Sequence, residues 1–263
     1  MARAIAESMI AARGPFQGVT QIIRYNWPYY FFALLLVGAG VAVALWAALP
    51  APFTWIILLG TGLTAFWSMT SILVSFYIYD VSPLYRWEWL AGLLNPSPRN
   101  WVNLHAGLDE TTEAVRLLFP ASQGRTFDIY DPLKMSERSI ERARSSAKKG
   151  PSGNNADFRG LPIADSECDA AFLIFSAHEI RDWTDRLRFF NELHRILKPD
   201  GTLVLVEHLR DVWNFAAYGP GFRHFYARAE WTRVAEEVGL SVQSERSITP
   251  FVRCFVFSKA MGK

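Results

Sequence analysis

Hydrophobic residues dominate two stretches near the start of the chain. Residues 29–49 and 53–79 contain no Asp, Glu, Lys or Arg, and a Pro-Ala-Pro sequence at 50–52 separates them. A helix needs about 20 apolar residues to cross the hydrocarbon core of a bilayer, and each stretch is long enough. Prolines between two helical patterns indicate a tight turn. The pattern therefore predicts a transmembrane helical hairpin at 29–80, preceded by an N-terminal segment, 1–28.

The positive charges around this hairpin predict its orientation. The turn between the two stretches has no Lys or Arg, whereas arginines flank the hairpin on both sides: Arg3, Arg13, Arg24, Arg86 and Arg99. Positive residues are retained on the cytoplasmic side of a membrane. We therefore expect a multi-pass protein of the inner (cytoplasmic) or intracytoplasmic membrane, with the following domain in the cytoplasm. The lipid bilayer is the expected partner, and other transmembrane subunits are a second class of partner.

A short segment, 81–100, connects the hairpin to the rest of the chain. Its middle part, 84–94, combines Trp, Leu and Tyr residues with one Arg and one Glu. This composition suits a short amphipathic helix that lies flat at the membrane surface. Pro96 and Pro98 would end such a helix.

Beyond this connector, short apolar runs alternate with amphipathic stretches. Such alternation is typical of a doubly wound, mostly parallel sheet that is covered by helices on both faces. We expect an α/β domain at 101–263 whose last two strands form an antiparallel pair. The expected strands are 101–105, 126–130, 170–175, 202–207, 241–248 and 252–258, and the expected helices are 109–119, 134–149, 183–197 and 229–238.

Composition and charge narrow the classes of function. The chain has 263 residues, of which 51% are hydrophobic, and a formal net charge of +2. A balance so close to neutral gives no basis for nucleic-acid binding. The two cysteines, Cys168 and Cys254, are far apart and lack metal-ligand spacing, so we predict no metal site and a reducing compartment.

Two motifs occur in the order found in a known family. LPIADSECDAAF at 161–172 is followed by a helical stretch and then by RILKPDGTLVLVEH at 195–208. In this order they resemble the class I S-adenosylmethionine-dependent methyltransferases, above all the branch that methylates quinones, sterols and other small molecules. The resemblance covers about residues 101–258. It implies a Rossmann-like, doubly wound, seven-stranded fold with S-adenosylmethionine as the cofactor.

The resemblance also implies positions for cofactor binding. Asp131 ends the second expected strand, where the family places an acidic side chain that accepts both ribose hydroxyls. Asp157 precedes the LP motif, where the family uses an Asp for the adenine amino group, and the next residue, Phe158, lines the ring. Ser176 follows the next buried strand, where the family holds the methionine part. The alternatives are a turn residue for Asp131 and a solvated loop carboxylate for Asp157.

The loop after the first strand departs from the family pattern. The family has an acidic residue followed by Gly-x-Gly-x-Gly, which lets the backbone approach the cofactor and leaves a helix N-terminus free to bind it. Here Asn103 replaces the acidic residue, His105 the first glycine and Asp109 the last, so that only Gly107 remains. Two interpretations stay open. Asn103 or His105 supplies hydrogen bonds at a modified cofactor site, or binding is lost and the domain is a scaffold.

Candidate bases for methyl transfer follow the carboxyl ends of two apolar strands. A histidine can take a proton from an O–H or N–H nucleophile near neutral pH. We predict His178 as the first candidate catalytic residue and His208 as the second. For each residue, the alternative is a polar side chain that is simply satisfied at a strand end.

Two functions from different classes fit these observations. The first is a membrane-anchored methyltransferase that acts on an acceptor in the bilayer, such as a lipid, a quinone, an isoprenoid or a tetrapyrrole. The second is a catalytically degenerate methyltransferase-fold protein that serves as a structural or accessory subunit of a larger membrane complex, for example a photosynthetic or respiratory one. The glycine loop discriminates between the two, because an open pocket there supports the enzyme and a filled one supports the scaffold.

Overall fold

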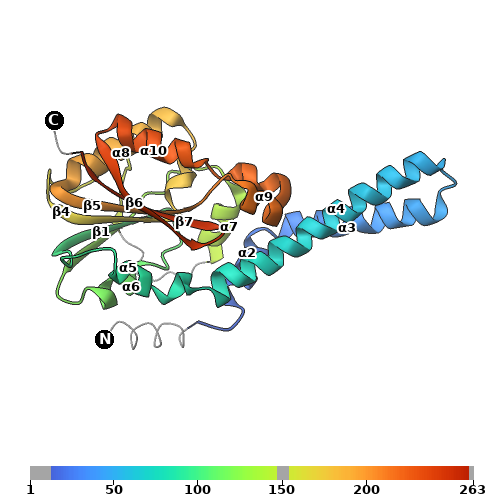
Figure 1. Ribbon diagram of the computed structural model, residues 1–263, viewed down its shortest axis with the longest axis horizontal. Coiled ribbons are helices and arrows are strands. Elements are labelled where there is room, and N and C mark those ends of the chain that lie inside the picture. The colour runs from blue at the N-terminus through green and yellow to red at the C-terminus, as the bar shows by residue number, and fades with distance from the viewer. Residues whose placement is uncertain (1–12, 147–153, 261–263) are drawn as a thin grey trace.

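The computed structural model describes residues 13–146 and 154–260. A long helical rod projects from an α/β domain, and the sheet of that domain lies between two layers of helices (Figure 1). The rod and the domain correspond to the expected hairpin and the expected α/β region.

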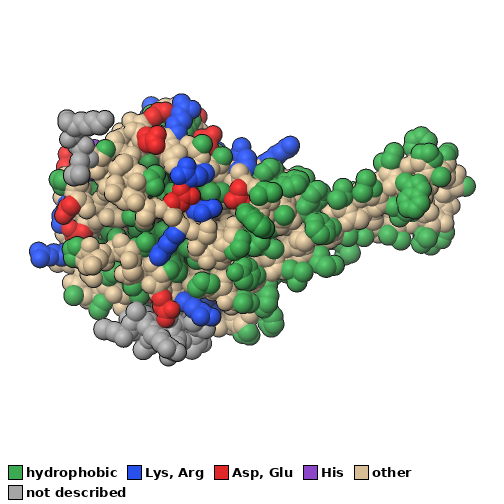
Figure 2. All heavy atoms as spheres, in the orientation of Figure 1, with side chains coloured by type: hydrophobic (Ala, Val, Ile, Leu, Met, Phe, Trp, Pro, Cys, Tyr) green, Lys and Arg blue, Asp and Glu red, His purple; other side chains and the backbone are tan. Residues whose placement is uncertain are grey.

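Two helices form the rod: α3, Trp27–Trp46, and α4, Ala51–Phe76. Each has a proline in its first turn, where the missing N–H group costs no hydrogen bond. The helices approach closely at Gly40, where a Cβ atom would overlap the Thr61 side chain. By length and composition both are able to cross a membrane, and only 6% of the most apolar part of each is buried. Apolar side chains cover the projecting part of the rod on the face shown in Figure 2, whereas the charged side chains there belong to the domain.

The inner end of the rod is tied to a short helix, α2, Gln17–Tyr25. After α4 the chain makes a π-helical turn, η1, Tyr77–Val81, which brings Asp80 to the N-terminus of α2. The two carboxylate oxygens of Asp80 accept hydrogen bonds from the N–H groups of Gly18 and Val19, at 2.7 and 2.8 Å. These N–H groups have no partner within their own helix, and negative charge is favourable at a helix N-terminus. Asp80 therefore fixes α2 against the rod.

The connector packs onto the sheet. It forms two short helices, η2, Pro83–Arg86, and α5, Glu88–Ala91. Leu84, Trp87 and Leu90 are almost completely buried, in one cluster with residues of the sheet. Our expectation of a helix lying flat at the membrane surface is therefore wrong for these side chains, because their apolar surface covers a face of the sheet.

The described residues form one seven-stranded sheet with the order β3-β2-β1-β4-β5-β7-β6. Neighbouring strands are parallel except at β7, which runs antiparallel to both β5 and β6. The predicted closing pair is thus confirmed, but the second expected strand ends earlier than we predicted. The strands are β1 Asn100–His105, β2 Gln123–Asp128, β3 Asn154–Asn155, β4 Cys168–Ile174, β5 Leu197–His208, β6 Leu240–Thr249 and β7 Val252–Lys259.

Alternate residues of β5 belong to the two cores of the domain. Leu203 and Leu205 pack with α8, Trp183–Ile196, and α10, Arg228–Glu237. Val204 and Val206 pack in the cluster that contains the connector and α6, Thr112–Leu118. This alternation follows from the two-residue period of a strand, and it buries both faces of the sheet. The remaining short helices are α7 Arg138–Ser146, η3 Ala177–Glu179, α9 Val212–Tyr218 and η4 Gly219–His224.

Candidate functional site

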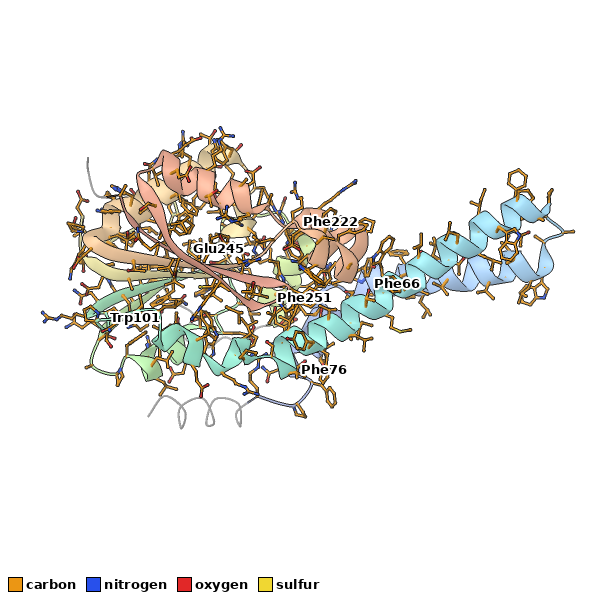
Figure 3. The ribbon with its side chains drawn as sticks, viewed as in Figure 1. Phe66, Phe76, Trp101, Phe222, Glu245 and Phe251 are labelled. Atoms are coloured by element: carbon orange, nitrogen blue, oxygen red, sulfur yellow. The ribbon has the colours of Figure 1, made fainter. Side chains whose placement is uncertain are left out.

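The carboxyl edge of the parallel strands lies against the base of the rod. The Tyr79 hydroxyl of η1 is 2.8 Å from Nε2 of His208, the last residue of β5. The Thr70 hydroxyl of α4 donates a hydrogen bond to the Ala217 carbonyl of α9, at 2.9 Å. Figure 3 shows Phe251, in the turn between β6 and β7, close to the inner end of α4. Because ligands of doubly wound sheets bind beyond the carboxyl ends of the strands, the candidate site adjoins the rod.

The loop after β1 is held by its own side chains. Asn103 is buried and donates hydrogen bonds to Oδ1 of Asp109, at 3.2 Å, and to Oγ1 of Thr112, at 2.9 Å. The same Asp109 oxygen accepts hydrogen bonds from the N–H groups of Thr111 and Thr112 at the start of α6. The amide of Asn103 is thus engaged within the loop. We predicted that Asn103 binds the cofactor, but its hydrogen bonds are made within the loop, and no contact of Asn103 supports that role directly.

His105 presents an unpaired donor beside the one remaining glycine of this loop. Its Nδ1 accepts a hydrogen bond from the N–H group of Gly107, at 3.1 Å. Burial lowers the pKa of His105, so the neutral ring carries its proton on Nε2. This Nε2 atom is buried and has no hydrogen-bond partner among the described residues. An unsatisfied buried donor is costly, which makes His105 a candidate contact for a ligand.

The acidic residue at the carboxyl end of β2 is Asp128. We predicted Asp131 for this position, but β2 ends at Asp128, which pairs in register with His105. Oδ1 of Asp128 accepts a hydrogen bond from the N–H group of Tyr130, and Oδ2 forms an ion pair with Nη1 of Arg144, at 2.7 Å. Asp131 lies beyond the strand end. Isoleucine and tyrosine follow Asp128 in TFDIYD, so the apolar pattern alone allowed a later strand end.

Arg144 of α7 covers the start of the candidate cofactor site. Gly107 has φ +122°, and a Cβ atom there would overlap the Arg144 side chain. The guanidinium lies 4.1 Å from the ring centroid of Tyr130 and donates a hydrogen bond to the Ala106 carbonyl. Neither Asp128 nor Arg144 was predicted from the sequence. No local signal identifies Arg144, because it lies on α7, far from this loop in the sequence, and reaches it only in the folded chain.

Asp157 and Phe158 differ in their exposure. The Asp157 side chain is 54% exposed and pairs with Nε of Arg159 at 2.8 Å, and this hydrogen bond lowers the pKa of Asp157. Arg159 also pairs with Asp131 through Nη2, at 3.1 Å. Phe158 is completely buried and packs against Phe189 in the core. The structure therefore offers Asp157 as an accessible carboxylate, whereas Phe158 has no free ring face.

Ser176 links the end of β4 to β1. Its hydroxyl donates a hydrogen bond to the Leu104 carbonyl at 2.8 Å, and the side chain is buried. The preceding residue, Phe175, has φ +52°, which is uncommon for a non-glycine residue and strained for a bulky one. Such backbone outliers cluster at functional sites. The β4 end is therefore fixed in a special conformation just before His178.

His178 lies between two carboxylates. Its Nδ1 is 2.7 Å from Oε2 of Glu207, and its Nε2 is 3.3 Å from Oε1 of Glu179. Burial lowers the pKa of His178, but the charges and hydrogen bonds of these two carboxylates outweigh it and raise the pKa to about 10. His178 therefore holds its proton at neutral pH. In this state it orients or donates, and it cannot act as a general base.

His208 has both ring nitrogens occupied. Nδ1 donates to the Phe251 carbonyl at 2.9 Å, and because burial lowers the pKa of His208 to about 4, the neutral Nε2 accepts from Tyr79. The ring is stacked between Phe175 and Phe225, with centroid distances of 5.1 and 4.8 Å. His208, the second predicted catalytic residue, thus links the sheet to the rod. Both of its ring nitrogens are used for structural hydrogen bonds.

A second histidine from outside the predicted site reaches His178. The rings of His178 and His224, which ends η4, are 5.2 Å apart. His224 is also close to Glu137, with Nδ1 and Oε1 3.5 Å apart, and to Arg181, whose Nη2 is 2.6 Å from Nδ1. The hydrogen bond with His224 lowers the pKa of Glu137 to about 2. Distant sequence positions thus form one charged cluster at the carboxyl edge.

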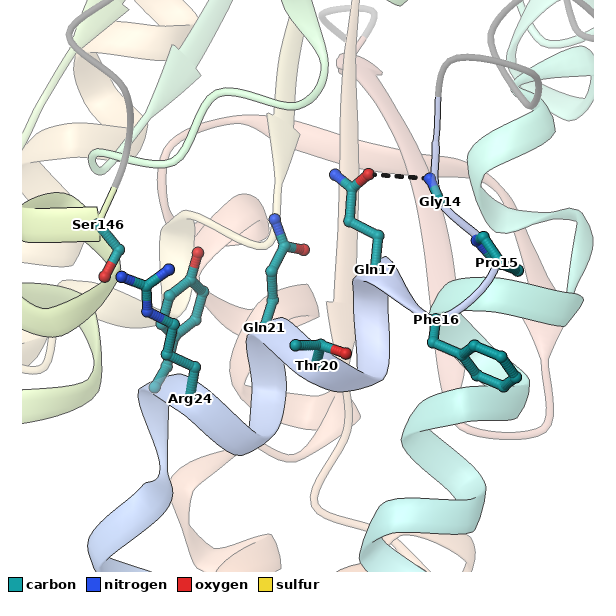
Figure 4. Close-up of a pocket in the computed structure, with 9 residues that line it drawn as sticks. Gly14, Pro15, Phe16, Gln17, Thr20, Gln21, Arg24 and Ser146 are labelled. Atoms are coloured by element: carbon teal, nitrogen blue, oxygen red, sulfur yellow. Dashed lines mark hydrogen bonds between the residues drawn. The ribbon is translucent and has the colours of Figure 1, made fainter.

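A separate hollow of about 360 Å³ lies beside α2 (Figure 4). Its lining includes Phe16, Gln21 and Arg24, together with Ser146 at the end of α7. The Gly14 N–H group donates a hydrogen bond to Oε1 of Gln17 at its rim, at 3.2 Å. None of the predicted site residues lines this hollow, so it is distinct from the charged cluster.

Comparisons with known proteins agree with this fold. A family model described as a methyltransferase domain matches residues 121–205. The chain is similar to a SAM-dependent methyltransferase from Aquifex aeolicus, with 16% sequence identity, a TM-score of 0.51 and coverage of 73% of this chain and 97% of that chain. It is also similar to the mitomycin 7-O-methyltransferase MmcR, with 15% identity, a TM-score of 0.52 and coverage of 97% of this chain and 75% of that chain. No curated protein matches the sequence. The domain therefore has the class I methyltransferase fold, and the family match supports S-adenosylmethionine as its cofactor.

Proposed function

We propose that this protein is an S-adenosylmethionine-dependent methyltransferase that the rod holds in a membrane, and that its acceptor partitions into the bilayer. The acceptor class is a lipid, a quinone, an isoprenoid or a tetrapyrrole. The observation that carries the proposal is the junction of rod and domain. An apolar rod with almost no burial joins the domain at the edge where the cofactor and the acceptor would bind. A soluble acceptor would gain nothing from this arrangement.

Helix α9 supports a membrane position for this edge. Val212 and Trp213 are 71% and 58% exposed, although both are apolar. Phe215 of the same helix contacts Trp67 of α4, with ring centroids 5.6 Å apart, so the exposed surface continues the apolar surface of the rod. Phe222 of η4 lies beside α9, near the rod (Figure 3). Aromatic side chains favour the headgroup region of a bilayer, and we propose that α9 lies there.

The residues at the ends of β1 and β2 fit the cofactor in chemical type. A carboxylate such as Asp128 accepts two hydroxyl donors, and the unpaired Nε2 of His105 is a donor for an anionic or carbonyl oxygen. Gly107 permits close approach of the backbone. Arg144 has to release Asp128 and move off Gly107 before a ligand contacts either of them.

Methyl transfer from a sulfonium needs mainly proximity and alignment. Held by Asp128 and His105, S-adenosylmethionine would transfer its methyl group to an oxygen or nitrogen of the acceptor, its sulfur would keep the electrons of the broken bond, and the acceptor would lose a proton. The cofactor supplies the methyl group, and this chain binds and orients both reactants. Glu137, Glu179 and Glu207 at the carboxyl edge place negative charge where the acceptor proton has to leave.

A scaffold function remains the second candidate because of one specific observation. Arg144 overlies Gly107 and occupies the Asp128 carboxylate, as expected where a cofactor is no longer bound. In that case the rod would pack against other transmembrane subunits and the domain would cover the cytoplasmic side of a complex.

A methyl-transfer assay separates these two functions. Full-length protein is reconstituted in nanodiscs that contain the total lipid extract of the source membranes, and S-adenosylmethionine with a labelled methyl group is added. We expect label in the organic extract, and we expect Asp128→Asn to abolish it while Asp131→Asn does not. Absence of label from the extract, together with absence of cofactor binding, would leave the scaffold as the function.

A further inference from the structure

His178, Glu179 and His224 form a compact group of metal-ligand types at the carboxyl edge. One possible ligand atom from each of the three side chains lies within 4.8 Å of the others. His178 and Glu179 come from η3, after β4, and His224 ends η4, far along the chain. Two imidazoles and one carboxylate are a donor set that suits Zn²⁺, Fe²⁺, Mn²⁺ and Co²⁺. We predicted no metal site from the spacing of the two cysteines, and these three residues have no characteristic spacing in the sequence.

The first histidine is oriented as metal-bound histidines are. Nδ1 of His178 bonds to the Glu207 carboxylate at 2.7 Å, and Glu207 is 1% exposed. Carboxylate partners of this kind fix the ring, so that a metal ion that displaces the proton of the other nitrogen can use that nitrogen as its ligand. The other nitrogen, Nε2, points to Glu179, at 3.3 Å. That separation is close to the spacing of two ligands that share one ion, since each bond is about 2 Å long.

Glu179 provides a second, independent observation. The residue is 7% exposed, and its Oε2 atom is buried without a hydrogen-bond partner among the described residues. Leaving a buried carboxylate oxygen unsatisfied is costly. A cation bound beside it would satisfy this oxygen.

The charges around the group favour a cation. Glu137, Glu179 and Glu207 surround the two histidines, and Arg181 is the basic side chain that contacts both Glu137 and His224. A guanidinium cannot act as a ligand, so Arg181 competes with a metal ion for His224.

We propose that His178, Glu179 and His224 bind one divalent transition-metal ion at the carboxyl edge of the sheet. Three protein ligands leave coordination positions open for an acceptor oxygen. An ion there would act as a Lewis acid, which makes the acceptor hydroxyl easier to deprotonate before it attacks the methyl carbon. This role rests on the proposed methyltransferase function, whereas metal binding itself does not.

The binding test uses metal alone, without S-adenosylmethionine. Full-length protein in detergent is stripped with a chelator and titrated with Co²⁺, and bound metal is measured by visible absorption and by elemental analysis. We expect one ion per chain. Glu179→Gln and His224→Asn should each weaken Co²⁺ binding by about 10- to 100-fold or more. Loss of a side chain that only supports a metal ligand already costs that much, and these two residues are ligands themselves. Arg181→Gln should strengthen Co²⁺ binding.

The control is His194→Asn, on α8 and outside the cluster, which should leave the affinity unchanged. Thermal melting shows whether each variant is folded, and His224→Gln replaces His224→Asn if the latter is not. Failure of wild-type protein to bind Co²⁺, Zn²⁺ or Mn²⁺ would overturn the proposal and leave an ion-pair cluster. Binding that survives both Glu179→Gln and His224→Asn would also overturn it. Separate calorimetry with S-adenosylmethionine shows whether the cofactor site has failed as well.

Discussion

The two halves of the carboxyl edge differ in how their charges are used. At the ends of β1 and β2, the carboxylate of Asp128 is paired with Arg144, an arginine that also covers Gly107. At the ends of β4 and β5, buried carboxylates surround His178. Buried charge is costly unless it is paired, and the carboxylates of Asp128, Glu179 and Glu207 are all buried and paired. The two halves thus differ in the partner of their carboxylates: one arginine closes the half next to β1 and β2, whereas a histidine lies between two carboxylates in the half next to β4 and β5.

The two halves are also coupled. Ser176 at the end of β4 donates its hydrogen bond to the Leu104 carbonyl of β1, so the positions of the two strand ends are linked. A substitution that moves one strand end is therefore expected to move the other as well.

The largest expected effect is that of Glu207→Gln. Glu207 is buried, and its carboxylate faces the imidazolium of His178, so the substitution removes one partner of a buried ion pair. We expect the free energy of unfolding to fall by about 3 kcal/mol, measured by denaturant titration in detergent. Glu245→Gln, at a more exposed carboxylate paired with Arg228, is the control and should change it far less.

The pH dependence of the free energy of unfolding, measured on the metal-free protein, tests whether His178 is charged. The pKa of His178 is about 10 in the folded protein and 6.5 by reference, so its contribution is complete below about pH 6.5 and is lost as the pH rises through 10. Glu207→Gln should flatten this decline. An unchanged profile between pH 6.5 and 10 would contradict the account of His178.

The next effect concerns the other half of the edge. Arg144→Ala frees Asp128 and Gly107, so it should tighten S-adenosylmethionine binding about tenfold, since displacing a charge-assisted hydrogen bond costs about 1.5 kcal/mol. Calorimetry measures the affinity. Arg138→Ala, at an exposed residue of the same helix, should leave it unchanged. Equal affinities for wild type and Arg144→Ala would show that Arg144 does not close the site.

The smallest effect concerns the contact between rod and domain. Tyr79→Phe removes the hydroxyl that donates to Nε2 of His208 and should lower the unfolding free energy by about 1 kcal/mol. Tyr77→Phe, in the same turn, keeps its ring contact with Phe251 and should have little effect. If the two substitutions behave alike, the hydrogen bond to His208 does not stabilise the junction.

Sequence patterns predicted the helices of the rod and most strands of the sheet, because local periodicity and proline positions determine them. The same patterns misplaced the connector. Trp87 and Leu90 read as an interfacial surface, and only the fold shows that the face of the sheet covers them. Apolar composition predicts burial or membrane contact, but it does not say which of the two occurs.

The candidate site was predicted less completely, since its residues meet through long-range contacts. His178 was identified from its position after a buried strand. Its neighbour His224 comes from a segment 46 residues later in the sequence. Asp128 was missed because the apolar residues after it extended the expected strand. Arg144 reaches its carboxylate from a helix whose position no local pattern specifies.

The proposed cofactor site uses Asp128. It is tested most directly by calorimetric titration of full-length protein in detergent with S-adenosylmethionine, alongside Asp128→Asn and Asp131→Asn. The account predicts binding to wild type, a loss of about tenfold or more in Asp128→Asn from one missing hydrogen bond to a charged group, and near-wild-type affinity in Asp131→Asn. Absence of binding to both wild type and Arg144→Ala would contradict it, as would a loss confined to Asp131→Asn.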